Sequence, residues 1–337
     1  MKRVDGLFSR IVAFDNLLAA ERRAARGKRD RPAVQRFEFH LERELILLQQ
    51  ELREGAYRPG PFVSFEVQDP KRRAICAAPF RDRVVHHAVC DVLESVFERR
   101  AIQDSYACRN GKGSHAAIAR AQAFARRWPY VLKCDVRRFF ASVDHDTLRA
   151  LLARLFKEPA LVGLLDRMID HGPPDTPPGL GLPIGNLTSQ HFANLYLGEL
   201  DHHVTDRLAV RGYLRYMDDC LFFGADKPSL HLLHAEVRSF LRERLRLDLK
   251  PIATPVMPVT EGIGFLGFRL YPDTIRLNQR TRKRFRRQVR DIESAYRAGR
   301  LDLVELASRA ASLYAHVQHA DSARLRGQVA AASIVDG

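Results

Sequence analysis

The segment Tyr216-Met217-Asp218-Asp219 constrains the fold of this 337-residue chain more than any other. It lies between two partly apolar runs, Tyr213 to Tyr216 and Cys220 to Phe223, which predict two short strands joined by a tight turn at Met-Asp-Asp. Such a turn pushes two acids out of the sheet together, where their repulsion is costly unless cations neutralise it. Acids in this arrangement can hold Mg²⁺ over a triphosphate, although aspartate pairs are also common in ordinary hairpin turns.

A third aspartate ends an upstream apolar stretch, Tyr130 to Asp135, and two aromatic residues, Phe139 and Phe140, follow it. Ligands of open sheets bind at strand ends, so Asp135 is placed to act beside the Asp218-Asp219 turn. Taken singly, an aspartate in this position can equally cap the turn that follows a strand. The combination of the two segments favours a shared site.

A loop at residues 179–190 precedes a helix-like run, His191 to Leu197. Its Pro and Gly residues fix the loop, and its Asn, Thr and Ser residues offer N-caps to the helix. The free backbone N–H groups of a helix N-terminus can receive template or nucleotide phosphates.

In this order, an Asp-x4-Phe segment, a Gly-rich loop and an aromatic-Met-Asp-Asp turn resemble the palm of reverse transcriptases. Four further segments resemble the same family, namely a fingertip strand at Pro70–Ile75, the next helix at Arg81–Ala88, the following loop at Ser105–His115 and the hairpin that grips the primer terminus at Gly262–Phe268. Most members carry Gln before the loop glycine, whereas this chain carries Ile184 and then Gly-Asn-Leu-Thr-Ser-Gln. That pattern is similar to the reverse transcriptases of diversity-generating retroelements and to bacterial group II-intron-like lineages. In the retroelement family this position is linked to low fidelity opposite template adenine.

The resemblance implies an α+β, right-hand polymerase fold with fingers, a palm of split βαβ type with an antiparallel sheet, and a helical thumb. We expect N-terminal helices and fingers over 1–120, a palm over 121–270 that includes the loop 179–190 and the hairpin 262–270, and a basic helical thumb over 271–337.

The resemblance also implies the site. Asp135, Asp218 and Asp219 would be catalytic, and with the Val136 carbonyl they would hold two Mg²⁺ ions, or Mn²⁺ in their place. Phe140 would exclude a ribose 2′-hydroxyl, and Lys250 would protonate the leaving pyrophosphate. The remaining expected dNTP-binding residues are Lys71, Arg72, Arg73, Ile184 and Gly185, and the expected template or primer contacts are Arg109, Asn186, Gln190, Gly264, Phe265, Arg282 and Arg286.

Helical periodicity predicts a helix through Phe37 and Leu52 and another through Val85 and Phe97, on which His86 and His87 are packed or solvated rather than ligands. Alternation over 62–67 predicts a strand between them. Two stripes over 285–296 and 303–317 predict the thumb helices, the first of them crowded with arginines. Like charges this dense repel unless an anion shares them, so a phosphate backbone is the expected partner.

A net charge of +15 and a pI of about 10.0 indicate a polyanionic partner. Without an apolar run of some ~18 residues or a signal core, nucleic acid is favoured over a membrane surface and the expected location is the cytoplasm of a bacterium, or of a phage host. Five dispersed cysteines indicate neither a zinc site nor a disulfide framework. Template RNA, a DNA or RNA primer, dNTPs and a basic accessory protein are the expected partners.

Three functions remain open at this point. The first is the error-prone polymerase of a diversity-generating retroelement, and the second is a reverse transcriptase of bacterial antiviral defence. The third is a non-catalytic RNA-binding or splicing-helper module with a decayed palm, against which the intact acids and basic fingertip argue. A nucleotidyl cyclase palm would also use paired acids, but it would lack the basic fingers and the Arg-rich thumb.

Overall fold

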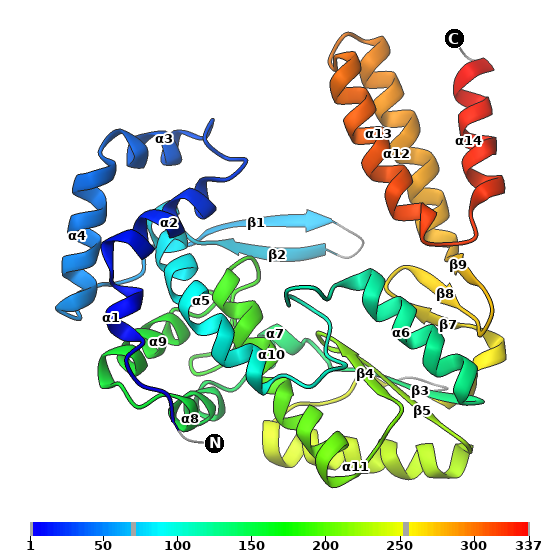
Figure 1. The fold of residues 1–337 in the computed structure, drawn as a ribbon, viewed down its shortest axis with the longest axis horizontal. Coiled ribbons are helices and arrows are strands. Elements are labelled where there is room, and N and C mark those ends of the chain that lie inside the picture. The colour runs from blue at the N-terminus through cyan, green and yellow to red at the C-terminus, as the bar shows by residue number, and fades with distance from the viewer. Residues whose placement is uncertain (1–2, 69–71, 252–255, 336–337) are drawn as a thin grey trace. The chain divides into compact units, whose positions relative to one another are not determined.

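A computed structural model describes residues 3–68, 72–251 and 256–335 of the protein, which divide into two compact units (Figure 1). Unit 1 comprises residues 1–108, 135–209 and 236–251, and unit 2 comprises 109–134, 210–235 and 252–337. Both units combine helices with antiparallel strands, which confirms the predicted α+β class. The fingers, palm and thumb boundaries at 120 and 270 stay a prediction.

Unit 1 is built mainly of helices around α5 (Phe80–Arg100). Apolar residues recur on nearly every side of α5, and Val84, Val85 and Leu93 are fully buried. The helix packs against α2 and α10, and each core side chain of this size contributes roughly 1.5–3 kcal/mol when removed from water. The other unit 1 helices are α1 (Phe8–Ile11), α2 (Phe14–Ala25), α3 (Pro32–Phe39), α4 (Leu41–Arg53), α7 (Phe139–Ser142), α8 (His145–Leu155), α9 (Pro159–Asp170) and α10 (Leu187–His202), which ends in a π-helical turn (His203–Arg207).

The prediction of one continuous helix through Phe37 and Leu52 is wrong, because the structure has two helices there. His40 leaves the helical backbone with φ −118° and ψ 32°, which separates α3 from α4. The break lets Phe37 on α3 and Leu45 on α4 both be buried.

The strand predicted at 62–67 is confirmed as β1 (Val63–Gln68), which pairs antiparallel with β2 (Arg72–Ala77). Every residue of β1 is exposed, and its alternation leaves Val63, Phe65 and Val67 on one face. The hairpin thus projects from the core of unit 1 and is held at the end of β2, where Cys76 is buried.

Unit 2 contains a sheet in the order β4-β5-β3-β6, formed by β3 (Tyr130–Asp135), β4 (Tyr213–Tyr216), β5 (Asp219–Gly224) and β6 (Val256–Pro258). The helix α6 (Ser114–Arg127) packs against β4 and β5, with Phe124 5.4 Å from Phe223 between ring centroids. β3 belongs to unit 2 except for its last residue, Asp135, with which unit 1 resumes. The helix α11 (Lys227–Leu245) likewise begins in unit 2 and ends in unit 1.

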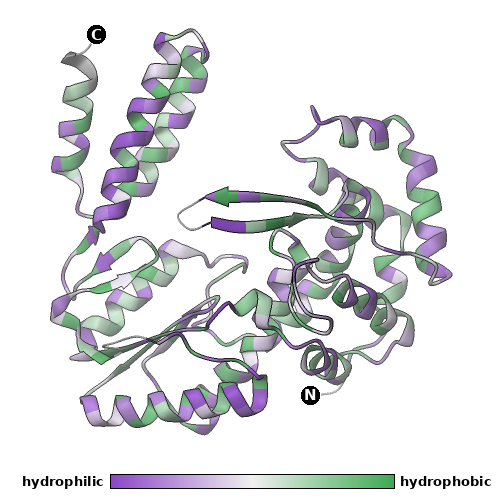
Figure 2. Cartoon of the chain, turned by 180° about the vertical axis from the view of Figure 1, so that it is seen from behind, coloured by the Kyte–Doolittle hydropathy of each residue, from purple (hydrophilic) through white to green (hydrophobic). Residues whose placement is uncertain are grey.

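The hairpin predicted at 262–270 is confirmed: a short 3₁₀ turn (Val259–Glu261) precedes β7 (Ile263–Phe265) and β8 (Phe268–Leu270), which continue into β9 (Ile275–Leu277). The region predicted as the thumb contains the helices α12 (Gln279–Arg297), α13 (Leu303–Gln318) and α14 (Ala323–Val335). α12 and α13 lie side by side, and much of α12 carries the hydrophilic colour (Figures 1 and 2). Phe285 and Val289 are the buried part of the predicted stripe, whereas Tyr296 at its end is 40% exposed. No helix in the described ranges has the length and apolarity needed to cross a bilayer.

Candidate active site

The acidic turn is a two-residue hairpin in unit 2. β4 and β5 pair from Tyr213 with Phe222 to Tyr216 with Asp219, which leaves Met217 and Asp218 as the loop. The prediction of a Met-Asp-Asp turn is therefore corrected by one residue, because Asp219 already pairs in β5. Met217 has φ +54°, a conformation that costs a non-glycine residue roughly 1–2 kcal/mol. Strain of this kind is tolerated where surrounding groups fix it.

Arg215 is one of those groups. It lies on β4 with only 1% of its surface exposed, and its Nη1 donates to the carbonyl oxygen of Met217 at 3.0 Å. A buried guanidinium is rare unless its donors are satisfied, and this bond satisfies one of them while it holds the turn.

Lys133 lies on β3 of the same unit and contacts the turn. Its Nζ is 3.6 Å from Oδ1 of Asp219 and donates to the carbonyl oxygen of Gly264 at 2.7 Å. Lys133 and Asp135 are two residues apart on one strand, so their side chains project from the same face of β3. Lys133 was not among the residues predicted from the sequence, although the Lys-x-Asp spacing at the end of a strand was a visible signal.

Asp135 has a lysine partner of its own in unit 1. Lys250 Nζ donates to Oδ1 of Asp135 at 2.5 Å, and the backbone of the segment 248–250 pairs with residues 135–137. In that pairing the carbonyl of Asp135 and the N–H of Arg137 are the bonded groups. The N–H and C=O of Val136 therefore point away from the 248–250 segment, and the residue as a whole is 1% exposed.

The two aromatic residues after Asp135 have different environments. Phe139 is 2% exposed and belongs to the core, whereas Phe140 is half-buried. The carbonyl oxygen of Phe140 accepts the N–H of Leu182 at 2.7 Å. The segment that follows Asp135 and the loop that leads to Ile184 are thus joined through their backbones.

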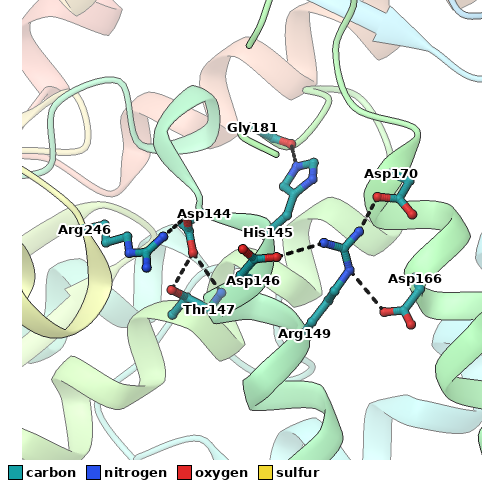
Figure 3. Close-up of polar contacts among 9 residues, drawn as sticks. All are labelled: Asp144, His145, Asp146, Thr147, Arg149, Asp166, Asp170, Gly181 and Arg246. Atoms are coloured by element: carbon teal, nitrogen blue, oxygen red, sulfur yellow. Dashed lines mark hydrogen bonds and ion pairs between the residues drawn. The ribbon is translucent and has the colours of Figure 1, made fainter. Parts of the chain in front are cut away.

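A polar network fixes the same two segments (Figure 3). Asp144 caps α8 by accepting from the N–H and hydroxyl of Thr147, and it also pairs with Arg246 at 2.7 Å. Burial raises the pKa of Asp144, but the bonds from Thr147 and Arg246 outweigh it and the net shift is downward. Next to it, His145 Nε2 lies 2.8 Å from the carbonyl oxygen of Gly181. Arg149 on the same helix pairs with Asp146, Asp166 and Asp170.

The Ile184-Gly185 loop sits directly on β2. The N–H of Cys76 donates to the carbonyl oxygen of Ile184 at 2.9 Å, so the anchor is a backbone bond. Gly185 has φ +118°, and a Cβ there would lie 2.9 Å from Cγ2 of Ile75. Only glycine fits this approach without displacing Ile75 or straining the loop.

The start of α10 differs from the prediction in two respects. The helix begins at Leu187 rather than at His191, so Thr188, Ser189 and Gln190 lie in the helix and not in the loop. Asn186 occupies the N-cap position but makes no capping bond, and its side chain is 4% exposed with neither amide atom hydrogen-bonded in the described structure. Thr188 is also buried, and its hydroxyl lies 2.7 Å from Nδ1 of His86. Burial lowers the pKa of His86 to about 3, so this histidine is neutral and packed, as the sequence predicted. Gln190 is half-buried on the next turn.

The expected triphosphate-binding cations lie on the β1–β2 hairpin. Arg72 forms an ion pair with Glu66 and its side chain is 75% exposed. Arg73 is exposed and stands opposite Val67 in the strand register. Lys71 lies outside the described residues.

The expected nucleic-acid contacts lie in unit 2, apart from Asn186 and Gln190. Gly264 is exposed, and a Cβ there would meet nothing within 4 Å, whereas Phe265 is buried at 2% exposure and belongs to the core of the hairpin. Arg282 and Arg286 are exposed on α12, and Arg286 also reaches Gln328 on α14. Arg109 is half-buried in the loop before α6.

The donor set suits magnesium. Carboxylates and a backbone carbonyl are hard oxygen ligands, and Mg²⁺ in nucleotide enzymes is commonly held by one or two carboxylates together with substrate phosphates. Asp218 lies in the turn and Asp219 begins β5, while Asp135 ends β3 of the same sheet and Val136 follows it. In the parts of the chain described, no three His, Cys, Asp or Glu side chains form a preformed metal cluster.

The known proteins that match this chain point to one family. The profile of the family described as reverse transcriptase (RNA-dependent DNA polymerase) matches residues 67–270. Protein YkfC of Escherichia coli is 27% identical over 272 residues, which cover 67% of this chain and 71% of the relative. The group II intron-encoded protein LtrA of Lactococcus lactis is 26% identical over 202 residues, which cover 57% of this chain and 33% of the relative.

Solved structures similar to this chain include two yeast telomerases. Telomerase from Candida albicans, in complex with a fragment of telomeric RNA, aligns with a TM-score of 0.46 and 12% identity over 81% of this chain and 55% of that one. Apo telomerase from Candida tropicalis aligns with a TM-score of 0.48 and 9% identity over 76% of this chain and 57% of that one. The chain thus spans little more than half of these telomerases and a third of LtrA.

Proposed function

Because the chain belongs to the reverse transcriptase (RNA-dependent DNA polymerase) family, we propose that it copies an RNA template into DNA by two-metal nucleotidyl transfer. Membership confirms the family and the right-hand polymerase fold that the sequence predicted. The proposal concerns the activity of this chain, its substrates and the roles of its residues.

The pairing of each acidic segment with a lysine carries the proposal. Asp135 pairs with Lys250, and Asp219 pairs with Lys133. Adjacent carboxylates repel, and ammonium groups at both places supply the positive charge that the acids need when no metal is bound. A divalent-metal site requires carboxylates that attract cations, and this chain has them at the end of β3 and at the β4–β5 turn.

In this proposal Asp135 and Asp218 would hold both ions, with Asp219 and the Val136 carbonyl beside them. Metal bound there would supply activation of the primer 3′-hydroxyl and neutralisation of charge on the leaving pyrophosphate. Arg72 and Arg73 neutralise the triphosphate from the hairpin, where their exposure leaves them accessible.

The Phe140 ring stands against the sugar and selects deoxynucleotides. The exposed backbone at Gly264 and the arginines of α12 bind the primer and template strands. The high density of arginine on α12 supports the second role, since a phosphate backbone relieves its repulsion.

We further propose that this polymerase is error-prone, as in a diversity-generating retroelement. Ile184 supports this, because an apolar side chain in place of Gln removes a hydrogen-bond donor beside the incoming nucleotide. A structured template RNA and a basic accessory protein are the partners that go with this role.

An intron-associated role is the second candidate. The relatives include group II intron-encoded protein LtrA and nuclear intron maturase 1 of Arabidopsis thaliana, the latter 30% identical over 87 residues. In that case the RNA partner is an intron, and template errors are not concentrated at one base.

The deciding experiment is Mg²⁺-dependent extension of a DNA primer on a defined RNA template, with the products sequenced. We expect synthesis in the wild type and a loss of at least ~10³-fold in Asp218→Ala, because metal-held charge contributes several kcal/mol to such reactions. Asp175→Ala, an exposed acid in the Pro-rich loop, is the matched control and should leave synthesis unchanged. Synthesis that persists in Asp218→Ala would overturn the site assignment.

The sequenced products separate the two roles. Substitutions concentrated opposite template adenine support the retroelement role. Accurate synthesis retains the polymerase and removes that role, in favour of the intron-associated one.

A further inference from the structure

The ammonium of Lys133 contacts two functional segments of unit 2 at once. It donates to the carbonyl oxygen of Gly264 in β7 at 2.7 Å and lies 3.6 Å from Oδ1 of Asp219 at the start of β5. We propose that Lys133 is a positioning residue that couples the primer-side hairpin β7–β8 to the acidic turn. The inference rests on the proposed function for its meaning in catalysis, whereas the coupling itself is a property of the folded chain.

The carbonyl that Lys133 binds is one that the sheet leaves open. The hairpin β7–β8 has a two-residue loop, Leu266-Gly267, so the flanking pair of Phe265 with Phe268 is hydrogen-bonded and the next pair, Gly264 with Arg269, is not. The N–H and C=O of Gly264 therefore point away from β8. Because β7 is the edge strand of the sheet β7-β8-β9, no other strand among the described residues takes them.

The surroundings of Gly264 suit a ligand. Gly264 is exposed, and a Cβ built on it would meet no atom within 4 Å. A glycine in a strand interior weakens the strand and often marks a place where a ligand comes close to the backbone. Lys133 thus holds the edge of the hairpin at the point where its backbone is most open.

The two contacts of Lys133 differ in kind. The bond to Gly264 has ordinary hydrogen-bond length, whereas the distance to Asp219 is that of an ion pair without a close hydrogen bond. A lysine carries three donors on one charge, so it can serve both acceptors. We therefore expect the charge of Asp219 to fix the position of the Lys133 ammonium, and the ammonium to fix the position of the edge strand β7.

The same sheet is also held at its other end, which supplies a matched control. Arg126 of α6 donates from Nε to the carbonyl oxygen of Pro272 at 2.8 Å, and Gln122 donates to that of Tyr271 at 3.2 Å. Like the bond from Lys133 to Gly264, these bonds join a side chain to a carbonyl oxygen and are exposed or half-buried. Unlike Lys133, however, Arg126 and Gln122 have no described contact with a carboxylate of the acidic turn. They fix the turn between β8 and β9.

The test is amide hydrogen exchange in the full chain without metal or nucleic acid, read in peptides that cover 262–270. We expect Lys133→Met and Asp219→Asn each to accelerate exchange there at least threefold, and the double variant to exchange less than twofold faster than Lys133→Met. Lys133→Arg, which keeps the charge and a donor, should restore most of the protection. Arg126→Met should accelerate exchange around Tyr271 instead, and its effect should multiply with that of Asp219→Asn.

Unchanged exchange at 262–270 in Lys133→Met overturns the inference, and so do effects of Lys133→Met and Asp219→Asn that simply multiply. Lys133 and Asp219 have side chains 28% exposed, so both variants should fold, and a thermal unfolding midpoint close to that of the wild type verifies this. Failure of wild-type primer extension would refute the proposed function alone, because the exchange cycle needs no synthesis.

Discussion

Lys250 holds Asp135 through both its side chain and its backbone. The ammonium lies 2.5 Å from Oδ1 of Asp135, and the N–H of Lys250 donates to the carbonyl oxygen of Asp135 at 2.8 Å. The side chains are 35% and 24% exposed, so solvent partly screens the pair. A divalent ion that binds Asp135 must compete with this ammonium.

Lys250→Met should therefore lower the Mg²⁺ concentration that half-saturates primer extension. A partly screened pair contributes up to about 1 kcal/mol, which corresponds to a shift of roughly two- to fivefold. Extension rates measured over a Mg²⁺ titration give this value directly. Lys157→Met, at an exposed lysine after α8, is the control and should not shift the midpoint. A higher Mg²⁺ requirement in Lys250→Met would mean that Lys250 orients Asp135 for the metal rather than competing with it.

Phe140→Ala should admit ribonucleotides. Phe139 is the core aromatic of the pair, which leaves the half-buried Phe140 as the ring that can meet a sugar. A ring excludes a 2′-hydroxyl by overlap, and removing it should lower discrimination against ribonucleotides by about tenfold or more. Single-nucleotide incorporation of dNTP and rNTP measures the ratio. Phe140→Tyr keeps the ring and should keep the discrimination; equal ratios in wild type and Phe140→Ala would remove Phe140 from this role.

The elements that local pattern determines were predictable. Apolar runs and turn residues located β4 and β5, and helical spacing located α5 and the helices of the predicted thumb, because these signals depend on neighbours in sequence. The 262–270 hairpin was located by the resemblance to the family. The shift of Asp219 into β5 is a one-residue boundary error at the turn. It follows from the strand register, which no local signal specified.

The relationships between distant segments were not predictable. Lys133 and Asp219 are 86 positions apart, and their contact depends on β5 pairing beside β3 in the sheet order. For the side chain of Asn186, by contrast, a local signal existed and gave the wrong prediction. Its type favours an N-cap, but burial at the start of α10 overrides that local preference.

Ile184→Gln should reduce errors opposite template adenine. The loop is anchored by the carbonyl oxygen of Ile184, which accepts the N–H of Cys76, so the change of side chain leaves that bond in place. Gln adds a donor and an acceptor beside the nucleotide, and we expect the error frequency at adenine to fall about fivefold or more. Deep sequencing of the products measures it. Ile184→Val keeps the apolar character and should retain the wild-type spectrum; a spectrum that does not change in Ile184→Gln would separate this position from fidelity.

His86 should make the protein less stable in mild acid. Burial on α5 lowers its pKa to about 3, whereas in the unfolded chain it has the ordinary value near 6.5. Below pH 6.5 the unfolded chain binds a proton that the folded chain does not, so the free energy of unfolding falls as the pH falls from 6.5 towards 3. From pH 7.5 to 5.5 this group alone should remove about 1.4 kcal/mol.

Urea unfolding at the two pH values measures this loss, and His86→Gln isolates it. Gln can still bond to the Thr188 hydroxyl but does not titrate, so the variant should lose about 1.4 kcal/mol less than the wild type over the same pH change. Burial also lowers the pKa of His87 and His191, which act in the same direction in both proteins and cancel in the difference. His231→Gln, at an exposed position of α11, should leave the wild-type loss intact. If His86→Gln and the wild type lose the same unfolding free energy between pH 7.5 and 5.5, then His86 becomes protonated in the folded protein as well. The assignment of His86 as a neutral, packed residue beside Thr188 would then be wrong.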